Sequence, residues 1–177
     1  MGINSFPFRR RALSDLTKPK TVGDTKVVMA RLMLPQDANP AGNVHGGTIV
    51  KIIDDAAAAV AMRHARANVV TVSIDRLDFH APVYVGDLLT MRASMNFVGR
   101  TSMEVGVRVE AENMRTGMIR HTSSAYLTFV AMDEWERPKN VPPLAPQTEE
   151  ETRRFEAGQA RRELRLAASR LRREKSK

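Results

Sequence analysis

A single long apolar helix is predicted in a chain whose other regular segments alternate like strands. In residues 46–66, Ile49, Ile53, Ala56 and Val60 recur at helical spacing and form one apolar stripe. Period-two alternation, which is typical of half-buried antiparallel strands, is found at residues 25–35, 68–80, 87–98, 102–113 and 118–132. The chain therefore combines one core helix with about five strands.

The alternation also predicts which side chains face the core. On two strands we expect the apolar set to point inward, namely Leu89, Met91, Ala93, Met95 and Phe97 together with Met103, Val105, Val107, Val109 and Ala111. Glu104, Arg108 and Glu110 then lie on the solvent-facing side. The last three strands are joined by "GRT" and "NMRTG", which are suitable hairpin connections.

The order of these segments restricts the architecture. One helix with an apolar stripe must be covered by a curved sheet, because no second helix is available inside the domain. We therefore predict an α+β hot-dog fold, in which a curved antiparallel sheet of about five strands wraps around one central helix. A further helix is expected near the C-terminus.

The basic charge of the chain lies at its two ends. The net charge is +8, of which residues 1–23 and residues 147–177 carry +4 each, and residues 24–146 are balanced. We expect a flexible basic N-terminal arm over 1–23, a hot-dog domain over 24–140, and a Pro-rich linker with a basic helix over 141–177. No helix-turn-helix, zinc-finger or ribonucleoprotein pattern accompanies the charge, so no nucleic-acid partner is expected.

Composition excludes several classes of site. The chain has no cysteine, which excludes a disulfide framework, a thiolate zinc site and a Cys nucleophile. The four histidines lack metal-ligand spacing, so we expect no metal. No apolar run approaches the ~18 residues that span a membrane, so no stable membrane insertion is expected. The N-terminus lacks the apolar region of a secretory signal, which favours a cytoplasmic location, although its Arg-rich composition also suits organelle targeting.

The C-terminal helix has a clear start and a thin apolar stripe. Thr148 and Glu151 have the spacing of a capping box. The apolar stripe consists of Phe155, Leu164, Ala167 and Leu171. Two interpretations stay open: a long solvated helix that partly frays, or a helix that packs on a neighbouring subunit or contacts an anionic surface.

Two adjacent acids on the central helix have different surroundings. Asp55 lies opposite the core stripe, and Lys51 is placed four residues earlier to form a surface ion pair with it. Asp54 shares a stripe with Ala57 and Ala61 at the border of the core face. A carboxylate beside small residues can act as a general base in a groove, or it can simply lie at the edge of the wet face.

The segment "HGGT" places two glycines at the start of this helix. The first N–H groups of a helix have no partner within it, and Gly46 and Gly47 allow a ligand to approach the backbone closely. An oxyanion hole for a thioester carbonyl is one interpretation, and a tight strand-to-helix turn is the other. For His45 we expect a positional role, because no acid is placed by the sequence to orient it as a base.

Three segments together resemble the hot-dog acyl-CoA thioesterases, in particular the cytosolic brain-type acyl-CoA hydrolases and their short bacterial relatives. The segments are "PQDANPAGNVHGGTIVKIIDDAAA", "VVTVSIDRLDFHAPVYVGD" and "VGRTSMEVGVRVEAEN". The resemblance covers about residues 25–140. It implies hydrolysis of acyl-CoA to a free fatty or short-chain acid and coenzyme A, with no cofactor, since coenzyme A is part of the substrate and product.

The resemblance also implies the site residues. Asn39 in the loop and Asp54 on the helix would act together from opposite subunits of a homodimer, and trimers of dimers are common in the family. Asp54 would deprotonate water or attack directly, while Gly46 and Gly47 would hold the oxyanion. Contacts to coenzyme A are expected from His45 and from two short segments, Thr71, Val72 and Ser73 on one strand and Arg100, Thr101 and Ser102 in a hairpin.

Two other functions fit the same fold. A non-catalytic acyl-CoA-binding sensor would bind the ligand without releasing a thiol. A dehydratase acting on enoyl or hydroxyacyl thioesters normally uses a histidine beside the acid, and His45 is not placed by the sequence for that role. The sequence leaves the acyl chain length open, because several elements and the partner subunit would line the acyl tunnel.

Overall fold

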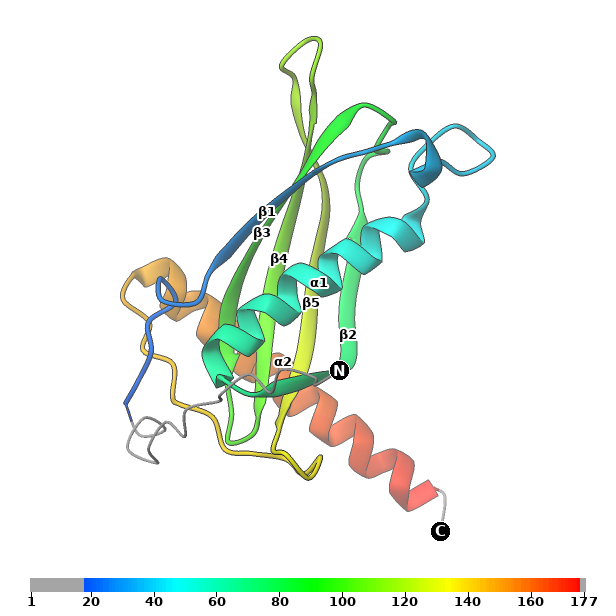
Figure 1. Ribbon diagram of the computed structural model, residues 1–177. Coiled ribbons are helices and arrows are strands. Elements are labelled where there is room, and N and C mark those ends of the chain that lie inside the picture. The colour runs from blue at the N-terminus through cyan, green and yellow to red at the C-terminus, as the bar shows by residue number, and fades with distance from the viewer. Residues whose placement is uncertain (1–17, 176–177) are drawn as a thin grey trace, which may run out of the picture.

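The computed structural model describes residues 18–175, which form one curved sheet with a helix on each face (Figure 1). The elements are β1 (Val27–Leu32), a short 3-10 helix (Pro35–Asp37), α1 (Gly46–Ala65), β2 (Asn68–Phe79), β3 (Asp87–Val98), β4 (Ser102–Asn113), β5 (Ile119–Met132) and α2 (Glu149–Lys175). The five antiparallel strands are ordered β1-β3-β4-β5-β2, so β1 and β2 form the two edges. The predicted hot-dog architecture is confirmed.

The core lies between α1 and the inner face of the sheet. The predicted helix stripe is buried, with Ile49, Ile53, Ala56 and Val60 at most 3% exposed. The predicted inward-facing residues of β4 are buried as well, and β5 adds Ala125, Leu127, Phe129 and Ala131. The two apolar periods, 3.6 on the helix and 2 on the strands, therefore meet in one hydrophobic core.

A β-bulge in β3 overturns one predicted orientation. Met95 pairs with Val105, but Phe97 pairs with Glu104, so the register shifts by one residue at Asn96. A bulge inserts an unpaired residue, which turns the following side chain to the opposite face. Phe97 therefore points outward, not inward as predicted, and its ring lies 5.0 Å from that of Phe155 on α2.

The outer face of the sheet is covered by α2, which corrects two further expectations. Glu104 is 1% exposed and not solvent-facing, because α2 lies over it and supplies Arg161 and Arg165 as ion-pair partners. The part of α2 from Phe155 to Arg165 therefore packs on the sheet of its own chain and is not a freely solvated helix. Leu164 and Leu171, further along the same helix, are exposed.

The N-terminal end of the described chain is part of the domain. Lys20 donates its backbone N–H to the carbonyl of Pro143, and Val22 is buried. The Lys20 side chain donates to the carbonyl of His64 at the end of α1. The segment 18–23, which we assigned to a flexible arm, therefore joins the fold, while residues 1–17 lie outside the described chain.

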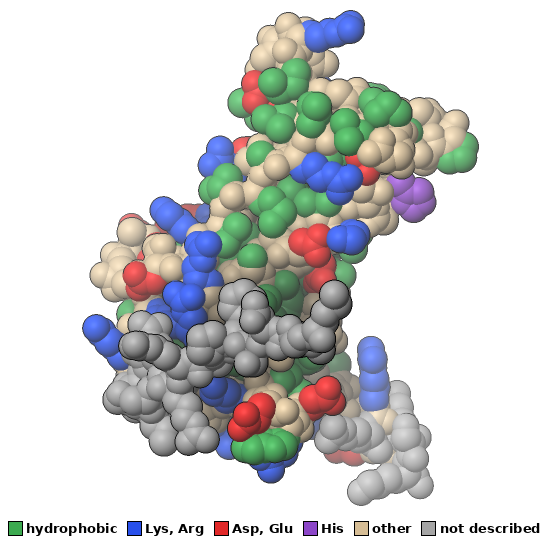
Figure 2. Space-filling view, in the orientation of Figure 1, with side chains coloured by type: hydrophobic (Ala, Val, Ile, Leu, Met, Phe, Trp, Pro, Cys, Tyr) green, Lys and Arg blue, Asp and Glu red, His purple; other side chains and the backbone are tan. Residues whose placement is uncertain are grey.

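Within residues 18–175, none of the helices is both long and apolar enough to cross a membrane. Exposed apolar side chains are nevertheless numerous. Figure 2 shows hydrophobic side chains gathered at the end of the molecule where the β4–β5 hairpin lies. The exposed residues of this hairpin include Met114, Met118 and Ile119. A surface of this kind is typical of protein contacts.

Candidate active site

The loop that precedes α1 is held by a buried acid that the sequence analysis missed. Asp37 is 5% exposed and pairs with Arg31 at 2.9 Å through Oδ1, while its Oδ2 accepts the Leu34 N–H at 2.9 Å. Its backbone carbonyl accepts the His45 N–H at 2.8 Å. Asp37 therefore connects the end of β1 to the start of α1. These contacts hold the two ends of the loop that carries Asn39.

Asn39 has a side-chain amide whose orientation is set by its own loop. Its Oδ1 accepts the backbone N–H groups of Ala41 at 2.9 Å and Asn43 at 3.2 Å. Because both contacts need an acceptor, the Nδ2 group is the one that points away from the loop. Asn39 can thus offer two N–H donors to a ligand or to another chain.

His45 is the N-cap of α1, a role compatible with the positional one we expected. Its Nδ1 accepts the Gly47 N–H at 2.9 Å, as capping side chains do at helix starts. The Gly47 N–H is therefore already hydrogen-bonded, so Gly47 does not provide the free oxyanion donor that we had expected. No acceptor among residues 18–175 takes the Gly46 N–H, so Gly46 is the better candidate.

The two adjacent acids of α1 are separated as the helical periodicity predicted. Asp55 pairs with Lys51 at 2.9 Å on the exposed face, and both side chains are at least half exposed. Asp54 is half-buried and accepts a hydrogen bond from the Thr71 hydroxyl on β2 at 2.8 Å between Oγ1 and Oδ1. The structure thus joins two predicted site residues, Asp54 and Thr71.

The strand that supplies Thr71 is an edge with two register shifts. Thr71 pairs with Phe129 and Ser73 with Thr128, so the chain gains one residue at Val72. In a regular strand Thr71 and Ser73 would share a face. Here Thr71 faces α1, whereas the Ser73 hydroxyl donates to Asp75 on the outer face at 2.8 Å.

Val72 is more than half exposed at this shift. Among the described strands, β2 has a neighbour on one side only. The backbone groups of its other edge lie beside Asp54 and can pair with a further strand or with the amides of a ligand.

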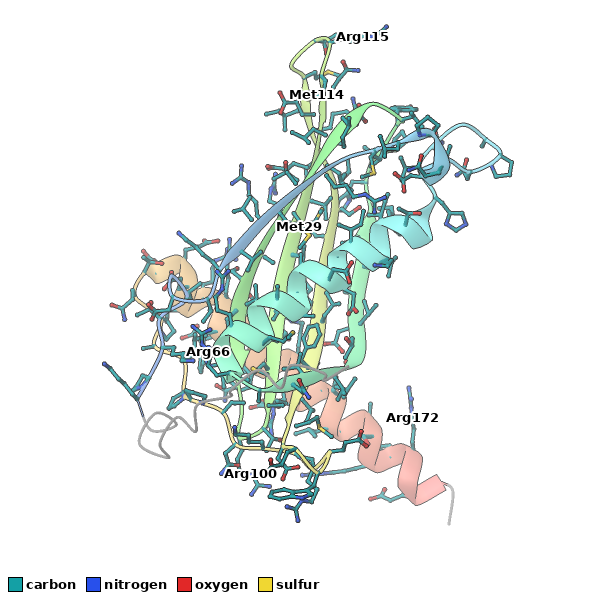
Figure 3. The ribbon with its side chains drawn as sticks, in the orientation of Figure 1. Met29, Arg66, Arg100, Met114, Arg115 and Arg172 are labelled. Atoms are coloured by element: carbon teal, nitrogen blue, oxygen red, sulfur yellow. The ribbon has the colours of Figure 1, made fainter. Side chains whose placement is uncertain are left out.

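The second predicted binding segment lies elsewhere in the same chain. Thr101 accepts the Ala131 N–H at 3.0 Å and Arg100 accepts the Val141 N–H at 3.0 Å through their carbonyls. Figure 3 shows Arg100 at the end of the molecule where Arg66 closes α1. The loop with Asn39 lies at the opposite end of the helix. Arg100, Thr101 and Ser102 are therefore not brought together with Asn39 within one chain.

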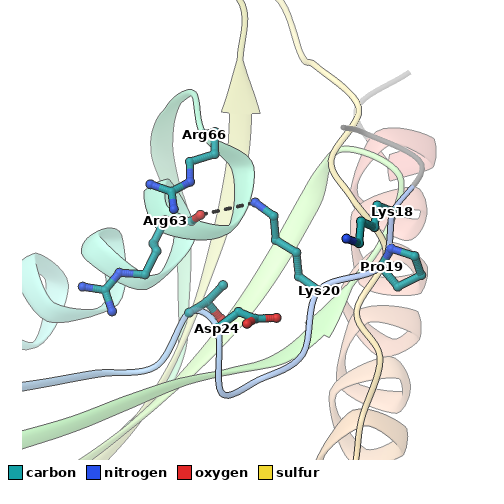
Figure 4. A pocket seen from close by; sticks show the side chains of 7 residues that line it. Lys18, Pro19, Lys20, Asp24, Arg63 and Arg66 are labelled. Carbon is teal, nitrogen blue, oxygen red and sulfur yellow. Dashed lines mark hydrogen bonds between the residues drawn. The ribbon is translucent and has the colours of Figure 1, made fainter. Parts of the chain in front are cut away.

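Two surface cavities lie away from Asp54. One of about 280 Å³ at the C-terminal end of α1 is lined by Lys18, Pro19, Lys20, Asp24, Thr25, Arg63 and Arg66 (Figure 4). One of its two lysines and one of its two arginines bind backbone carbonyls: Lys20 donates to the carbonyls of Arg63 and His64, and Arg63 donates to that of Lys26. The other cavity, of about 230 Å³, lies between α2 and the outer face of the sheet. Neither includes the Asp54–Thr71 pair.

In the described part of the chain, no group of three or more His, Asp or Glu side chains is arranged to hold a metal ion. The groups near Asp54 are the Thr71 hydroxyl, the backbone groups of β2 and the start of α1. These are the groups that activate water and stabilise an oxyanion.

Comparisons with known proteins agree with the hot-dog architecture. The model of the thioesterase superfamily matches residues 41–118, which include the start of α1, Asp54 and Thr71. The cytosolic acyl coenzyme A thioester hydrolase of Mus musculus is 36% identical over 146 residues, which are 81% of this chain and 38% of the mouse protein.

Solved structures extend the similarity over nearly the whole chain. An apo-hexameric acyl-CoA thioesterase superposes with a TM-score of 0.81 at 44% identity, covering 86% of this chain and 97% of the other. The acyl-CoA hydrolase of Staphylococcus aureus, solved with butyryl coenzyme A, coenzyme A and coenzyme A disulfide, gives 0.81 at 34% identity, covering 90% and 96%. The chain therefore belongs to the thioesterase superfamily of hot-dog proteins.

Proposed function

We propose that this chain is an acyl-CoA thioesterase whose site is built around Asp54. The observation that carries the proposal is the hydrogen bond from Thr71 to Asp54, which orients a half-buried carboxylate beside the free edge of β2. The names of the mouse and bacterial relatives support acyl-CoA as the substrate class. The mouse relative is named cytosolic, which supports a cytoplasmic location as well.

Residue spacing supports the same assignment. Variants of the Staphylococcus aureus hydrolase have been solved in which an Asn, an Asp or a Thr is replaced by Ala. In the numbering of that enzyme the Asp follows the Asn by 15 residues, and the Thr follows the Asp by 17. Asn39, Asp54 and Thr71 have the same two spacings in this chain.

The proposed reaction uses only water and the side chains named above. Asp54 accepts a proton from water while the water oxygen attacks the thioester carbonyl carbon, or Asp54 itself attacks that carbon. The Gly46 N–H, at the positive end of α1, stabilises the oxyanion. The carbon–sulfur bond then breaks, and the sulfur takes a proton and leaves as coenzyme A. Attack by water releases the acid directly, whereas attack by Asp54 leaves an anhydride between the acyl group and Asp54, which water then hydrolyses to the free acid. No cofactor is needed.

The second chain of a homodimer would complete the site. The exposed residues Val70, Val72 and Ile74 lie along the edge strand β2. Pairing this edge with a second copy of the chain would remove apolar area and unpaired backbone groups from water. Asn39 of one chain would then position the water or the thioester beside Asp54 of the other. The hexameric relative supports a trimer of such dimers.

The coenzyme A moiety would lie along the same edge. Backbone groups of Thr71, Val72 and Ser73 would bind the pantetheine amides, and His45 would border the thioester. Arg100, with Thr101 and Ser102, would take phosphate oxygens of a ligand bound mainly by the other chain, because guanidinium groups pair well with phosphates.

Free-thiol release from a panel of acyl-CoAs tests the proposal. The Asp54→Ala protein should fold, bind coenzyme A and lose turnover, whereas Asp55→Ala, changed at the neighbouring exposed acid, should keep it. Near-normal turnover by Asp54→Ala would contradict the assignment. Binding without thiol release by the unchanged protein would support the sensor, and an absorbance change at the double bond would support a dehydratase.

A further inference from the structure

Helix α2 contacts the outer face of the sheet through three residues spread over about three turns, and these residues reach three different strands. Phe155 packs on Phe97 of β3. Arg161 binds both oxygens of Glu104 on β4, with N–O distances from 2.6 to 3.2 Å. One turn later Arg165 binds Asp75 on β2. The helix thus reaches from the middle of the sheet to the edge strand that carries Thr71.

Four charged residues form the centre of this contact, which we call the outer ion cluster: Asp75, Glu104, Arg161 and Arg165. The Arg165 Nη1 lies 3.5 Å from Glu104 Oε2 and also donates to Asp75, so the arginine joins two strands. The Arg161 guanidinium additionally lies 4.0 Å from the centre of the Tyr126 ring on β5. Burial lowers the pKa of Arg161, but the bonds and charge of Glu104 outweigh it, so the net shift is upward and the cation is retained.

Asp75 is the member of the cluster that belongs to β2. Its carboxylate also accepts hydrogen bonds from Ser73 Oγ at 2.8 Å and from Thr128 Oγ1 at 3.2 Å, and its side chain is 13% exposed. Asp75 lies within the second register shift of β2, between Ile74 and Arg76. Donors from β2, β5 and α2 therefore converge on the residue where the strand is irregular.

An irregular edge strand needs such support. Within residues 18–175, β2 has β5 as its one strand neighbour, and its two register shifts interrupt that ladder on both sides of Ser73. A shift of one residue turns a side chain to the other face of a sheet. If only the second shift, at Asp75, were lost while Arg76–Phe79 kept their partners, the start of β2 would slide by one residue, Thr71 would pair with Val130, and its side chain would turn away from Asp54.

We propose that Arg165 and Asp75 are positioning residues for the thioesterase site: their ion pair holds the bulged stretch of β2 so that the Thr71 hydroxyl stays on Asp54. This proposal rests on the function proposed above. Neither residue touches the substrate, since both lie on the face of the sheet opposite α1. The alternative is that the pair only fastens α2, in which case its loss changes stability and leaves catalysis at Asp54 unaltered.

The kinetics of full-length variants separate these two roles. Arg165→Met keeps the apolar length of the side chain and removes the guanidinium. We expect kcat to fall by about tenfold with KM changed less than about twofold, because a misplaced Thr71 affects the reacting carboxylate more than substrate binding. Arg165→Lys should recover part of kcat, and Arg170→Met, at an exposed arginine of the same helix, should match the unchanged protein.

A double-mutant cycle with Thr71→Val gives the decisive comparison. If Arg165 acts through Thr71, then Arg165→Met causes no further loss of kcat in the Thr71→Val protein. The same fold-loss in both backgrounds, or no loss in the unchanged background, would overturn the proposal. Asp75→Asn, which keeps the contacts to Ser73 and Thr128, replaces Arg165→Met in the cycle if circular dichroism shows the latter to be unfolded.

The two proposals fail in distinguishable ways. Turnover retained by Asp54→Ala removes the proposed site itself, whatever Arg165 does. If Asp54→Ala loses turnover but Arg165→Met and Asp75→Asn have a normal kcat, only the positioning role is contradicted.

Discussion

Thr71 on the edge strand β2 donates a 2.8 Å hydrogen bond to Asp54 on the central helix α1. The two residues are 17 positions apart, and Thr71 faces inward because it pairs with Phe129, whereas the bulge at Val72 turns Ser73 to the outer face. One carboxylate oxygen of Asp54 must accept a proton from water. A hydrogen-bond donor on the other oxygen holds the carboxylate in the orientation that this transfer needs. The geometry of this pair therefore controls the proposed chemistry.

Removing the hydroxyl at this position tests that control. Thr71→Val keeps the shape of the side chain and should lower kcat by about tenfold, because a hydrogen bond to a charged group contributes more than about 1.4 kcal/mol. Steady-state thiol release measures the effect. Thr71→Ser, which restores the donor, should return most of the activity, and equal activity in the serine and valine proteins would argue against a role for the hydroxyl.

Gly158 is the glycine on which the docking of α2 depends. A Cβ added there would lie 2.7 Å from Phe97 Cβ and 3.1 Å from Glu104 Oε1. Gly158→Ala should therefore destabilise the protein by about 1–3 kcal/mol through overpacking, despite a gain of about 1 kcal/mol in helix propensity.

Urea unfolding measures this change. Ala160→Gly, made two residues later at an exposed position of the same helix, should cost about 1 kcal/mol from propensity alone. A stabilised Gly158→Ala protein would show that α2 does not press on the sheet at this point.

His64 gives the fold a pH dependence with a defined sign. The imidazole is fully buried and its Nε2 lies 2.8 Å from the Pro142 carbonyl oxygen. Burial lowers the pKa of His64 more than the Pro142 contact raises it, and the charge of Lys20 lowers it further. The folded protein thus holds a neutral His64, whereas the unfolded chain binds a proton below about pH 6.5.

The contribution of the neutral His64 to the free energy of unfolding should therefore be fully present above about pH 6.5. It should decrease as the pH falls from there toward the lowered pKa of the folded state, by about 1.4 kcal/mol per pH unit for one proton. Urea midpoints between about pH 7.5 and about pH 5.5 cover this window. His64→Gln should lose the His64 part of the slope, while His45→Gln, at an exposed histidine, should keep it. An unchanged slope in His64→Gln would contradict the assignment.

Periodicity was sufficient to predict the elements and most of their faces. The single apolar helix, the five strands and the separation of Asp54 from Asp55 follow from spacing along the chain, because burial on one face imposes a period. The outward orientation of Phe97 could not be predicted in this way, because the residues around the bulge still alternate between apolar and polar in the sequence. The burial of Glu104 did not follow either, because it depends on α2, whose arginines are 57 and 61 residues away.

The site was predicted in part for the same reason. The position of Asp54 follows from the helical period, whereas Thr71 was expected as a contact to coenzyme A from the resemblance, and the structure brings the two together. Two local hydrogen bonds were not predicted: the one from the Gly47 N–H to His45 and the one from the Leu34 N–H to Asp37. Several other polar side chains in the same loop could have made such bonds. "QDAN" did contain a signal for Asp37, since an Asp at the end of a strand often binds nearby backbone N–H groups.

The central claim is that Asp54 of one chain acts with Asn39 of another, and complementation between two inactive chains tests it most directly. Asn39→Ala and Asp54→Ala chains, co-expressed with different tags and purified through both, form dimers in which one site has both residues and the other has neither. We predict that each variant alone is inactive and that the mixed protein regains at least about a quarter of the unchanged turnover, as a two-fold interface requires. Mixed protein as inactive as its parents would show that the site does not combine Asn39 and Asp54 from different chains.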